Sequence, residues 1–345
     1  MGRKLLKRLL NIAFLVLVFS LTMWSVFYGA DLGKVLTHIR GANLLYILPG
    51  IACVVLFILG EALITWYLLR TLGNRISFWH CSLYAFIGFF YSAITPSASG
   101  GQPMQLLAMR KDDIPVGVST VVLAIVTITY KLVLVVIGIA VMVLQPASLM
   151  VYLEPVEWLM YVGLALNIVF IAGLLLLVFQ PNALRSFAYK LLHLVHRIRP
   201  FRDLEKQTRR LDRITSQYQG TADFFKHHQR IIVRVLFVTF IQRYLLFFVT
   251  WLTYRAFSLQ GTSVGVITGL QAMISVAVDM LPLPGGMGIS ENLFLEVFQP
   301  IFGEAFLLPG MVVSRGLAYY TQLVISAVMT VVSMIAIKDK TKLRT

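Results

Sequence analysis

The chain alternates long apolar blocks with short polar segments along most of its length. About 20 consecutive apolar residues in a helix cross the hydrocarbon core of a bilayer. Six blocks are of that order and carry few charges, at 9–30, 44–69, 116–144, 156–179, 232–257 and 307–337. The pattern therefore predicts an all-α polytopic membrane protein with at least six crossings.

Two further segments, 79–113 and 264–303, are apolar but interrupted by Pro and Gly. Each contains an apolar stretch, a break and a second short helix. Proline removes a backbone donor and glycine permits turns that other residues resist, so both segments are predicted to be broken helices. We assign to the hairpin loops Pro96, Gly100, Gly101 and Pro103 in the first break, and Pro282, Pro284, Gly285 and Gly286 in the second.

The composition is typical of a membrane protein. Of the 345 residues, 58% are hydrophobic and 13% are charged, whereas about 25% of a soluble domain is charged. The formal net charge is +15, but the basic residues lie in the loops, as the positive-inside rule expects, so we expect no nucleic-acid partner. The two cysteines and six histidines show no ligand spacing, and we predict no metal site and no cofactor.

Loop charges predict how the chain crosses the membrane. Both termini and the segment 182–230 are basic, whereas 145–157 carries two glutamates and no Lys or Arg. The termini and 182–230 are therefore expected in the cytoplasm and 145–157 outside. Counting the crossings then requires 79–113 to begin and end inside, and 264–303 to begin and end outside. Each segment is predicted to be a re-entrant hairpin.

The two halves of the chain, 1–155 and 156–345, thus share one layout in opposite orientation. Each half reads as span, span, broken hairpin, span, which gives six full spans and two re-entrant hairpins. Inverted-topology repeats with discontinuous helices are common in secondary transporters. The alternative is eight ordinary spans with proline kinks, which leaves both termini on the same side. The segment 182–230 reads as amphipathic helices that contact anionic lipids of the inner leaflet or dock a partner protein.

Charged residues inside the apolar segments are functional candidates, because a charge is costly at membrane depth. Lys131 and Arg315 each follow a glycine of a break by 30 residues, so they are candidate repeat equivalents. One hypothesis is a central polar cavity that binds an anionic head group, and the other is a set of buried ion pairs that fix the helix register. The substrate-binding candidates are Lys131, Arg315, Glu291, Asp279, Arg243 and Glu61. The sequence shows no catalytic constellation.

At the two breaks the sequence resembles the lysylphosphatidylglycerol synthase transmembrane-domain family, the flippase-like membrane half of the bacterial multiple peptide resistance factor. The resemblance rests on the motifs TPSASGGQP at 95–103 and PLPGGMGISE at 282–291, and it extends through the layout of spans. Two positions depart from the family pattern. Gln102 stands where the first motif often carries an acid, and Tyr130-Lys131 stands where the family often has an acid followed by Arg.

The resemblance implies that the protein flips or scrambles lipids, such as aminoacylated phosphatidylglycerol, between leaflets of a bacterial-type inner cell membrane. It implies that the hairpins meet at mid-membrane and that Glu291 and Arg315 serve this activity. The family's soluble aminoacyl-transfer domain has no counterpart in this sequence, so we expect the chain not to make the lipid itself.

The sequence therefore favours a translocator of a phospholipid or a related anionic or aminoacylated amphiphile, with membrane phospholipids as its partners. Two other classes stay open. One is a membrane-embedded transferase that acts on a lipid-linked substrate, for which Asp279 and Glu291 are the only carboxylate candidates. The other is a non-transporting scaffold that recruits a partner through 182–230. The sequence also leaves open whether the chain forms a homo-oligomer.

Overall fold

The computed structural model describes residues 31–179 except 96–97, residues 204–337 except 282, and Ser186 and Lys190. The predicted first span 9–30, the loop prolines Pro96 and Pro282, most of 180–203 and the basic tail lie outside the described residues. All regular structure in the described part of the chain is helical, which confirms the all-α class.

The helices follow the apolar blocks in chain order. In the first half they are α2 (Leu32–Arg40), α3 (Leu44–Thr71), α4 (Phe78–Ala93), α5 (Gly101–Lys111), α6 (Val116–Leu144) and α7 (Ala147–Leu153), followed by the short turn η2 (Glu154–Val156). In the second half they are α8 (Glu157–Phe179), α10 (Leu204–His227), α11 (Gln229–Ala256), α12 (Val264–Val278), η3 (Pro284–Gly286), α13 (Ile289–Arg315), the π-turn η4 (Gly316–Thr321) and α14 (Gln322–Ala336).

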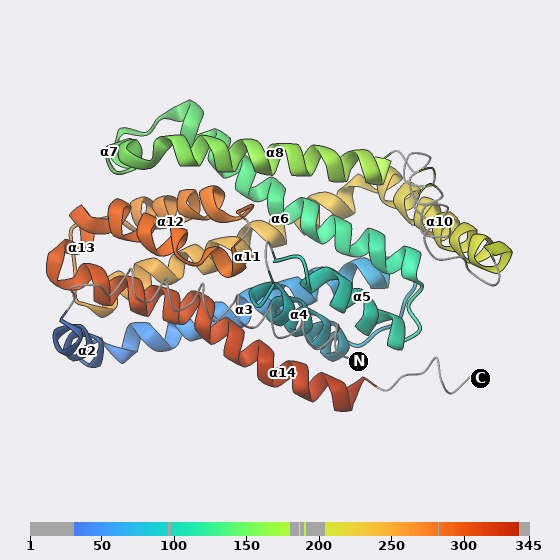
Figure 1. Cartoon of the computed structure of the whole chain (residues 1–345), viewed down its shortest axis with the longest axis horizontal. Coiled ribbons are helices and arrows are strands. Elements are labelled where there is room, and N and C mark those ends of the chain that lie inside the picture. The colour runs from blue at the N-terminus through green and yellow to red at the C-terminus, as the bar shows by residue number, and fades with distance from the viewer. Residues whose placement is uncertain are drawn as a thin grey trace.

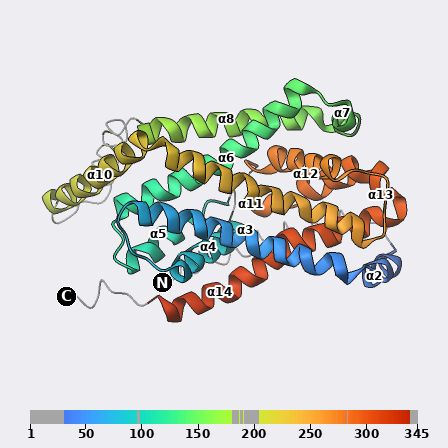
Figure 2. The same ribbon diagram turned by 180° about the vertical axis from the view of Figure 1, so that it is seen from behind.

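Long apolar helices run along the longest axis of the molecule (Figure 1). In the described part of the chain, five helical stretches are long and apolar enough to cross a membrane. Each overlaps one of the predicted spans after the first, and two of them begin well before the predicted span. They are Leu44–Thr71, Val116–Leu144, Ala147–Leu176, Gln229–Ala256 and Ile289–Ala336. The view from behind shows α3 lying along α11 (Figure 2), and these two helices share the most extensive interface. The chain is therefore a polytopic helical membrane protein.

The first broken segment forms a pair of helices, α4 and α5, that pack against each other. Asp112, which follows α5 and is fully buried, ties the bases of the two helices together. Its carboxylate lies 2.6 Å from Nδ1 of His80 and accepts a hydrogen bond of 2.5 Å from the hydroxyl of Tyr84. Both partners lie on α4. The base of the pair is thus closed by a polar contact, and the break lies at its other end.

The second broken segment consists of α12, a glycine-rich turn and the first part of α13. Gly285, Gly286 and Gly288 have φ values of 59°, 67° and 86°, which residues with a side chain rarely adopt. The second short helix of this segment begins at Ile289 and continues to Gly303, where the backbone leaves the helical conformation (φ 66°, ψ 166°). The last span therefore follows this short helix through a kink at one glycine, without an intervening loop.

The two pairs come from opposite ends of the molecule and their breaks face each other in its middle (Figure 1). The bases of α4 and α5 lie toward the end that carries α10 and the end of α14, whereas α12 begins toward the end that carries α2 and α7. The tip of α4 contacts η3. The hydroxyl of Tyr319 in η4 also donates a 2.9 Å hydrogen bond to the carbonyl of Ala93 at the end of α4.

Helix α10, which lies within the predicted amphipathic segment 182–230, packs on α6. Tyr218, Ala222 and Phe225 form its buried face, and they belong to the larger apolar core. The approach is close, because a Cβ at Gly117 of α6 would lie 2.7 Å from the carbonyl of Ile214. The apolar face of α10 is therefore occupied by protein, and its charged face is exposed.

The contact between α8 and α12 depends on a glycine in the same way. A Cβ at Gly163 would lie 2.5 Å from the backbone of both Ala277 and Val276, whereas a Cβ at Gly173 on the same helix would meet nothing within 4 Å. Asn167 of α8 adds a hydrogen bond of 3.3 Å to the carbonyl of Val276. The two helices pack backbone to backbone at this point.

We expect Gly163→Val to destabilise the protein, because backbone atoms cannot move aside as a flexible side chain can. Forcing extra volume into a packed contact costs about 1–3 kcal/mol. Thermal unfolding in detergent should therefore shift to lower temperature. Gly173→Val is the matched control on α8 and should unfold close to the wild-type temperature. Equal shifts in the two variants would show that α8 and α12 do not approach as described.

Candidate functional site

Apart from Asp112 at the base of the first hairpin, the charged residues buried in the apolar bundle gather around the two breaks. The first group is built on Glu291 in the first turn of α13 and Arg315 at the end of the same helix. Arg315 Nε donates a 2.8 Å hydrogen bond to Glu291 Oε1, and Arg315 Nη2 donates a 3.0 Å hydrogen bond to the carbonyl of Gly285. Glu291 Oε2 accepts a 2.7 Å hydrogen bond from the backbone of Gly288. The pair therefore clamps both sides of the glycine turn.

This arrangement explains how a broken backbone persists inside an apolar bundle. An unsatisfied backbone group in hydrocarbon costs several kcal/mol, and a charged partner gives the stronger kind of hydrogen bond. Glu291 is only 1% exposed, so its charge depends on Arg315 for compensation. The kink at Gly303 brings the two ends of α13 together, which makes this contact possible.

The second group joins the two halves of the chain. Lys131 Nζ on α6 forms an ion pair with Asp279, the residue that ends α12 just before the second break. The hydroxyl of Tyr130 donates a hydrogen bond to the other oxygen of the same carboxylate. The side chains of Lys131 and Asp279 are 9% and 13% exposed. The Asp279 carboxylate thus accepts hydrogen bonds from two neighbouring residues of α6.

Arg243 on α11 lies beside this group and is 5% exposed. Its guanidinium carbon lies 3.5 Å above the centre of the Tyr130 ring and 5.3 Å from that of Phe57, so cation–π contacts hold it on two faces. Its Nε is buried and has no hydrogen-bond partner among the described residues. Within the part of the chain that the structure describes, Arg243 forms no direct ion pair. The buried carboxylate of Glu61 interacts with it electrostatically at longer range.

Glu61 on α3 accepts a 2.6 Å hydrogen bond from the side-chain amide of Gln105 on α5. Gln105 is itself buried and fills the space over Gly88, where a Cβ would lie 2.1 Å from its nitrogen. Glu61 therefore connects a span to the first hairpin through a neutral partner. The structure places Glu61 in this contact with the hairpin and gives it no ion pair within the described residues.

The first break is stabilised by short side chains rather than by a cation. Thr95 Oγ1 donates to the carbonyl of Tyr91 (2.6 Å) and accepts from the backbone of Gly100 (2.9 Å). Gln102 hydrogen-bonds to Thr127 of α6. A Cβ at Gly101 would lie 2.6 Å from the carbonyl of Gly88, so only glycine allows α5 to start this close to α4.

Lys131 and Arg315 each follow a glycine of a break by 30 residues, but they do not make equivalent contacts. Arg315 reaches Gly285, the glycine from which its spacing was counted. Lys131 reaches Asp279 and lies 2.9 Å from the sulfur of Met280, so it contacts the opposite break. Both cations therefore stabilise the region of the second break.

Sequence reasoning missed Tyr319, which joins the two breaks. Besides its bond to the carbonyl of Ala93, its ring lies 5.0 Å from the guanidinium carbon of Arg315. A Cβ at Gly285 would lie 2.2 Å from that ring. The available signal was its position four residues after Arg315, which places both residues on one helix face.

Both carboxylates near the second break are engaged by cations. Asp279 and Glu291 each accept from a cation, so neither has the open environment of a general base. No group of three or more His, Cys, Asp or Glu residues that could hold a metal occurs in the described part of the chain. The arrangement offers a buried cation, two ion pairs and breaks in the helices.

Fold and buried charges together define a multi-pass helical membrane protein with a polar interior. The family model described as "Lysylphosphatidylglycerol synthase TM region" matches residues 9–326, and the chain belongs to this family. The resemblance seen at the two breaks is thereby confirmed over most of the sequence. A search among curated proteins finds no match. The family places the chain among membrane proteins related to lipids.

We expect Arg315→Met to destabilise the protein by about 3–5 kcal/mol, because it leaves Glu291 as a buried charge without its partner. The double variant Arg315→Met/Glu291→Gln should recover part of this loss, since the amide is neutral and still accepts from Gly288. Thermal unfolding of the single and double variants in one detergent measures the coupling. Losses that simply add would contradict the clamp.

Proposed function

We propose that this protein translocates a phospholipid, or a related anionic or aminoacylated amphiphile, between the leaflets of the membrane. The observation that carries the proposal is Arg243. A buried cation is costly, and this one has no ion-pair partner among the described residues. An anionic head group at this position would supply a direct partner, since Glu61 interacts with Arg243 only at longer range. Its phosphate would bind a guanidinium already held in place by Tyr130 and Phe57.

The helix lengths support re-entrant hairpins. Helix α5 has 11 residues and is about 16 Å long, and α12 has 15 residues and is about 22 Å long, at 1.5 Å per residue. Both are shorter than the hydrocarbon core of about 30 Å. Hairpins of opposite orientation that meet at mid-membrane form the inverted repeat proposed here, with 1–155 and 156–345 as its halves.

The distribution of charge supports a cytoplasmic position for the end that carries α10. Arg75, Arg110 and Lys111 flank the bases of α4 and α5, and α10 and the end of α14 lie toward the same end of the molecule (Figure 1). Glu154 and Glu157 lie around η2 toward the opposite end. By the positive-inside rule, the first hairpin then opens from the cytoplasm and the second from outside.

The ion pairs suggest how a head group moves through the protein. Lys131–Asp279 and Arg315–Glu291 each join a span to the second hairpin or its turn. A phosphate that approaches Arg243 competes with Asp279 for the neighbouring Lys131, because all three charges meet around Tyr130. Binding would thus loosen the contact that holds the tip of α12 to α6.

We expect Arg243→Gln to reduce lipid translocation by about tenfold or more, corresponding to at least ~1.4 kcal/mol of lost binding. Because no ion pair is lost among the described residues, thermal stability should stay the same or rise. The measurement uses purified protein in liposomes that contain a fluorescent phosphatidylglycerol, with a membrane-impermeant quencher that reports the leaflet. Arg234→Gln, an exposed arginine on the same helix, should translocate as wild type.

Two results would end the translocator proposal. One is wild-type protein that moves no fluorescent lipid above empty liposomes. The other is Arg243→Gln that is stable and moves lipid at the rate of the Arg234→Gln control. Loss of activity together with loss of stability would instead assign Arg243 a structural role.

The hairpin topology has its own test at Ser99, an exposed residue in the first break. In a background without Cys53 and Cys81, Ser99→Cys should resist a membrane-impermeant thiol reagent added from outside intact cells. Glu154→Cys, in the loop at the opposite end, should react readily and serves as the control. Labelling of Ser99→Cys from outside only would favour eight full spans and would contradict the proposed inverted repeat of re-entrant hairpins.

A further inference from the structure

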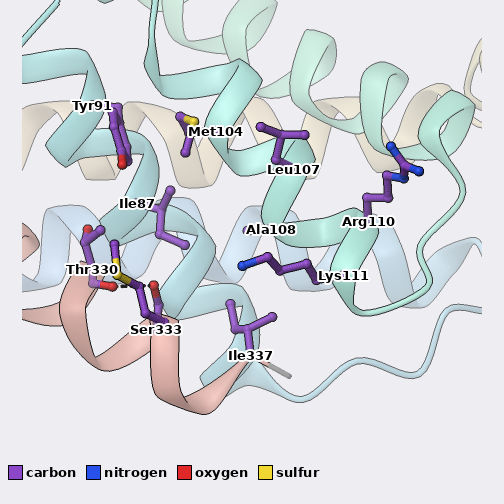
Figure 3. Close-up of a pocket in the computed structure, with 11 residues that line it drawn as sticks. Ile87, Tyr91, Met104, Leu107, Ala108, Arg110, Lys111, Thr330, Ser333 and Ile337 are labelled. Atoms are coloured by element: carbon purple, nitrogen blue, oxygen red, sulfur yellow. Dashed lines mark hydrogen bonds between the residues drawn. The ribbon is translucent and has the colours of Figure 1, made fainter. Parts of the chain in front are cut away.

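A groove opens between the first hairpin and the last helix, beside the contact of α4 with α14, near the end that carries α10. It lies between α4 and α5 on one side and α14 on the other, and its volume is about 380 Å³. Figure 3 shows side chains from all three helices turned toward it. Ligand sites commonly have volumes of about 300–1,000 Å³. The groove is separate from the buried charges at the breaks, since none of those residues lines it.

Two basic residues of α5, Arg110 and Lys111, line the groove, and they point in different directions. Lys111, the last residue of α5, points across it toward α14, whereas the neighbouring Arg110 points away (Figure 3). Lys111 is exposed and forms no ion pair with any described residue. The rest of the lining is mainly apolar, with Ile87 of α4 and Met104 and Leu107 of α5. The groove thus combines an apolar floor with a cation at one end.

Two hydroxyl groups on α14 add hydrogen-bond acceptors to the groove. Thr330 Oγ1 donates to the carbonyl of Ser326 (2.7 Å), and Ser333 Oγ donates to the carbonyl of Thr330 (2.6 Å). Because their protons are used within α14, these oxygens can offer only lone pairs to a ligand. A ligand that suits the groove carries a negative group for Lys111 and a hydroxyl or ammonium donor for α14.

The outer surface of α14 indicates that the groove opens to lipid. Val328, Val331 and Ile335 of this helix are 58%, 60% and 78% exposed. A stripe of exposed apolar side chains on a membrane-spanning helix faces acyl chains. Lys111 stands at the level where α4 and α5 have their bases, which is the proposed cytoplasmic surface. A cation at that level matches the phosphates of the inner leaflet.

We propose that this groove binds one anionic glycerophospholipid of the inner leaflet, with its phosphate on Lys111 and one acyl chain along Ile87, Met104 and Leu107. The hydroxyls of a glycerol head group would donate to Thr330 and Ser333. Phosphatidylglycerol has this chemistry, whereas phosphatidylcholine lacks both the net negative charge and the donors. As a loading site for translocation the groove rests on the proposed function, but lipid binding in it can be measured without transport.

The test is cross-linking of a photoactivatable phosphatidylglycerol to purified protein in phosphatidylcholine nanodiscs, followed by peptide mapping. We expect cross-links in α5 and α14, and about a fivefold loss in Lys111→Gln, the usual contribution of one basic residue near an anionic surface. Lys226→Gln removes an exposed cation from α10 and should cross-link as wild type, which controls for general attraction.

A second variant tests the apolar part of the groove without changing charge. Leu107→Ser replaces an exposed apolar side chain that lines the groove. It should also lower cross-linking, while thermal stability should remain close to that of the wild type. Excess soluble glycerol 3-phosphate should not compete with the lipid. Competition by this compound would show that the site takes a soluble phosphate, and would overturn the proposal.

The proposal is also overturned if Lys111→Gln and Lys226→Gln cross-link equally, or if the cross-links map away from α5 and α14. Failure of the translocator proposal gives a different pattern. In that case wild-type protein moves no fluorescent lipid in liposomes, yet phosphatidylglycerol still cross-links to the groove in a way that depends on Lys111.

Discussion

The structure depends on how the broken helices find hydrogen-bond partners for their backbone groups inside an apolar bundle. A continuous helix meets this requirement by itself, but a break leaves donors and acceptors without partners where water is scarce. At the second break the Arg315–Glu291 pair supplies these partners, through Gly285 on one side and Gly288 on the other. At the first break Thr95 does so without charge. The positions of α13, η4 and α5 follow from these contacts.

The same requirement explains why the breaks lie together. Tyr319 reaches from η4 to the end of α4 and packs over Gly285, so each break helps to cover the other. The ion pair between Lys131 and Asp279 then ties the end of α12 to α6 of the first half. Broken segments that would be unstable alone in lipid are thus buried against each other and against the spans.

Much of the fold could be predicted from sequence, because span length, proline, glycine and loop charge act locally. The spans after the first, both breaks and six of the buried charges were visible as patterns, whereas the buried Asp112 was not. The partners of the charges were not, since they depend on how each helix is rotated and tilted against distant helices. Lys131 and Arg315 have the same spacing from their breaks, yet only Arg315 contacts the glycine concerned. Gly303 was invisible as a kink, because a single glycine within an apolar segment is common.

The two hypotheses for the buried charges, a binding cavity and a set of structural ion pairs, are compatible. Arg315 and Glu291 are needed by the backbone of the break, and Lys131 and Asp279 join the two halves. Arg243 differs, because stacking on Tyr130 holds it in place while its Nε has no hydrogen-bond partner in the described part of the chain. The cation–π contacts and the long-range interaction with Glu61 offset part of the cost of burying this cation, but no direct ion pair does so among the described residues. The proposed head group would bring the opposite charge directly to Arg243, and Tyr130 would pass that event on, since it also donates to Asp279.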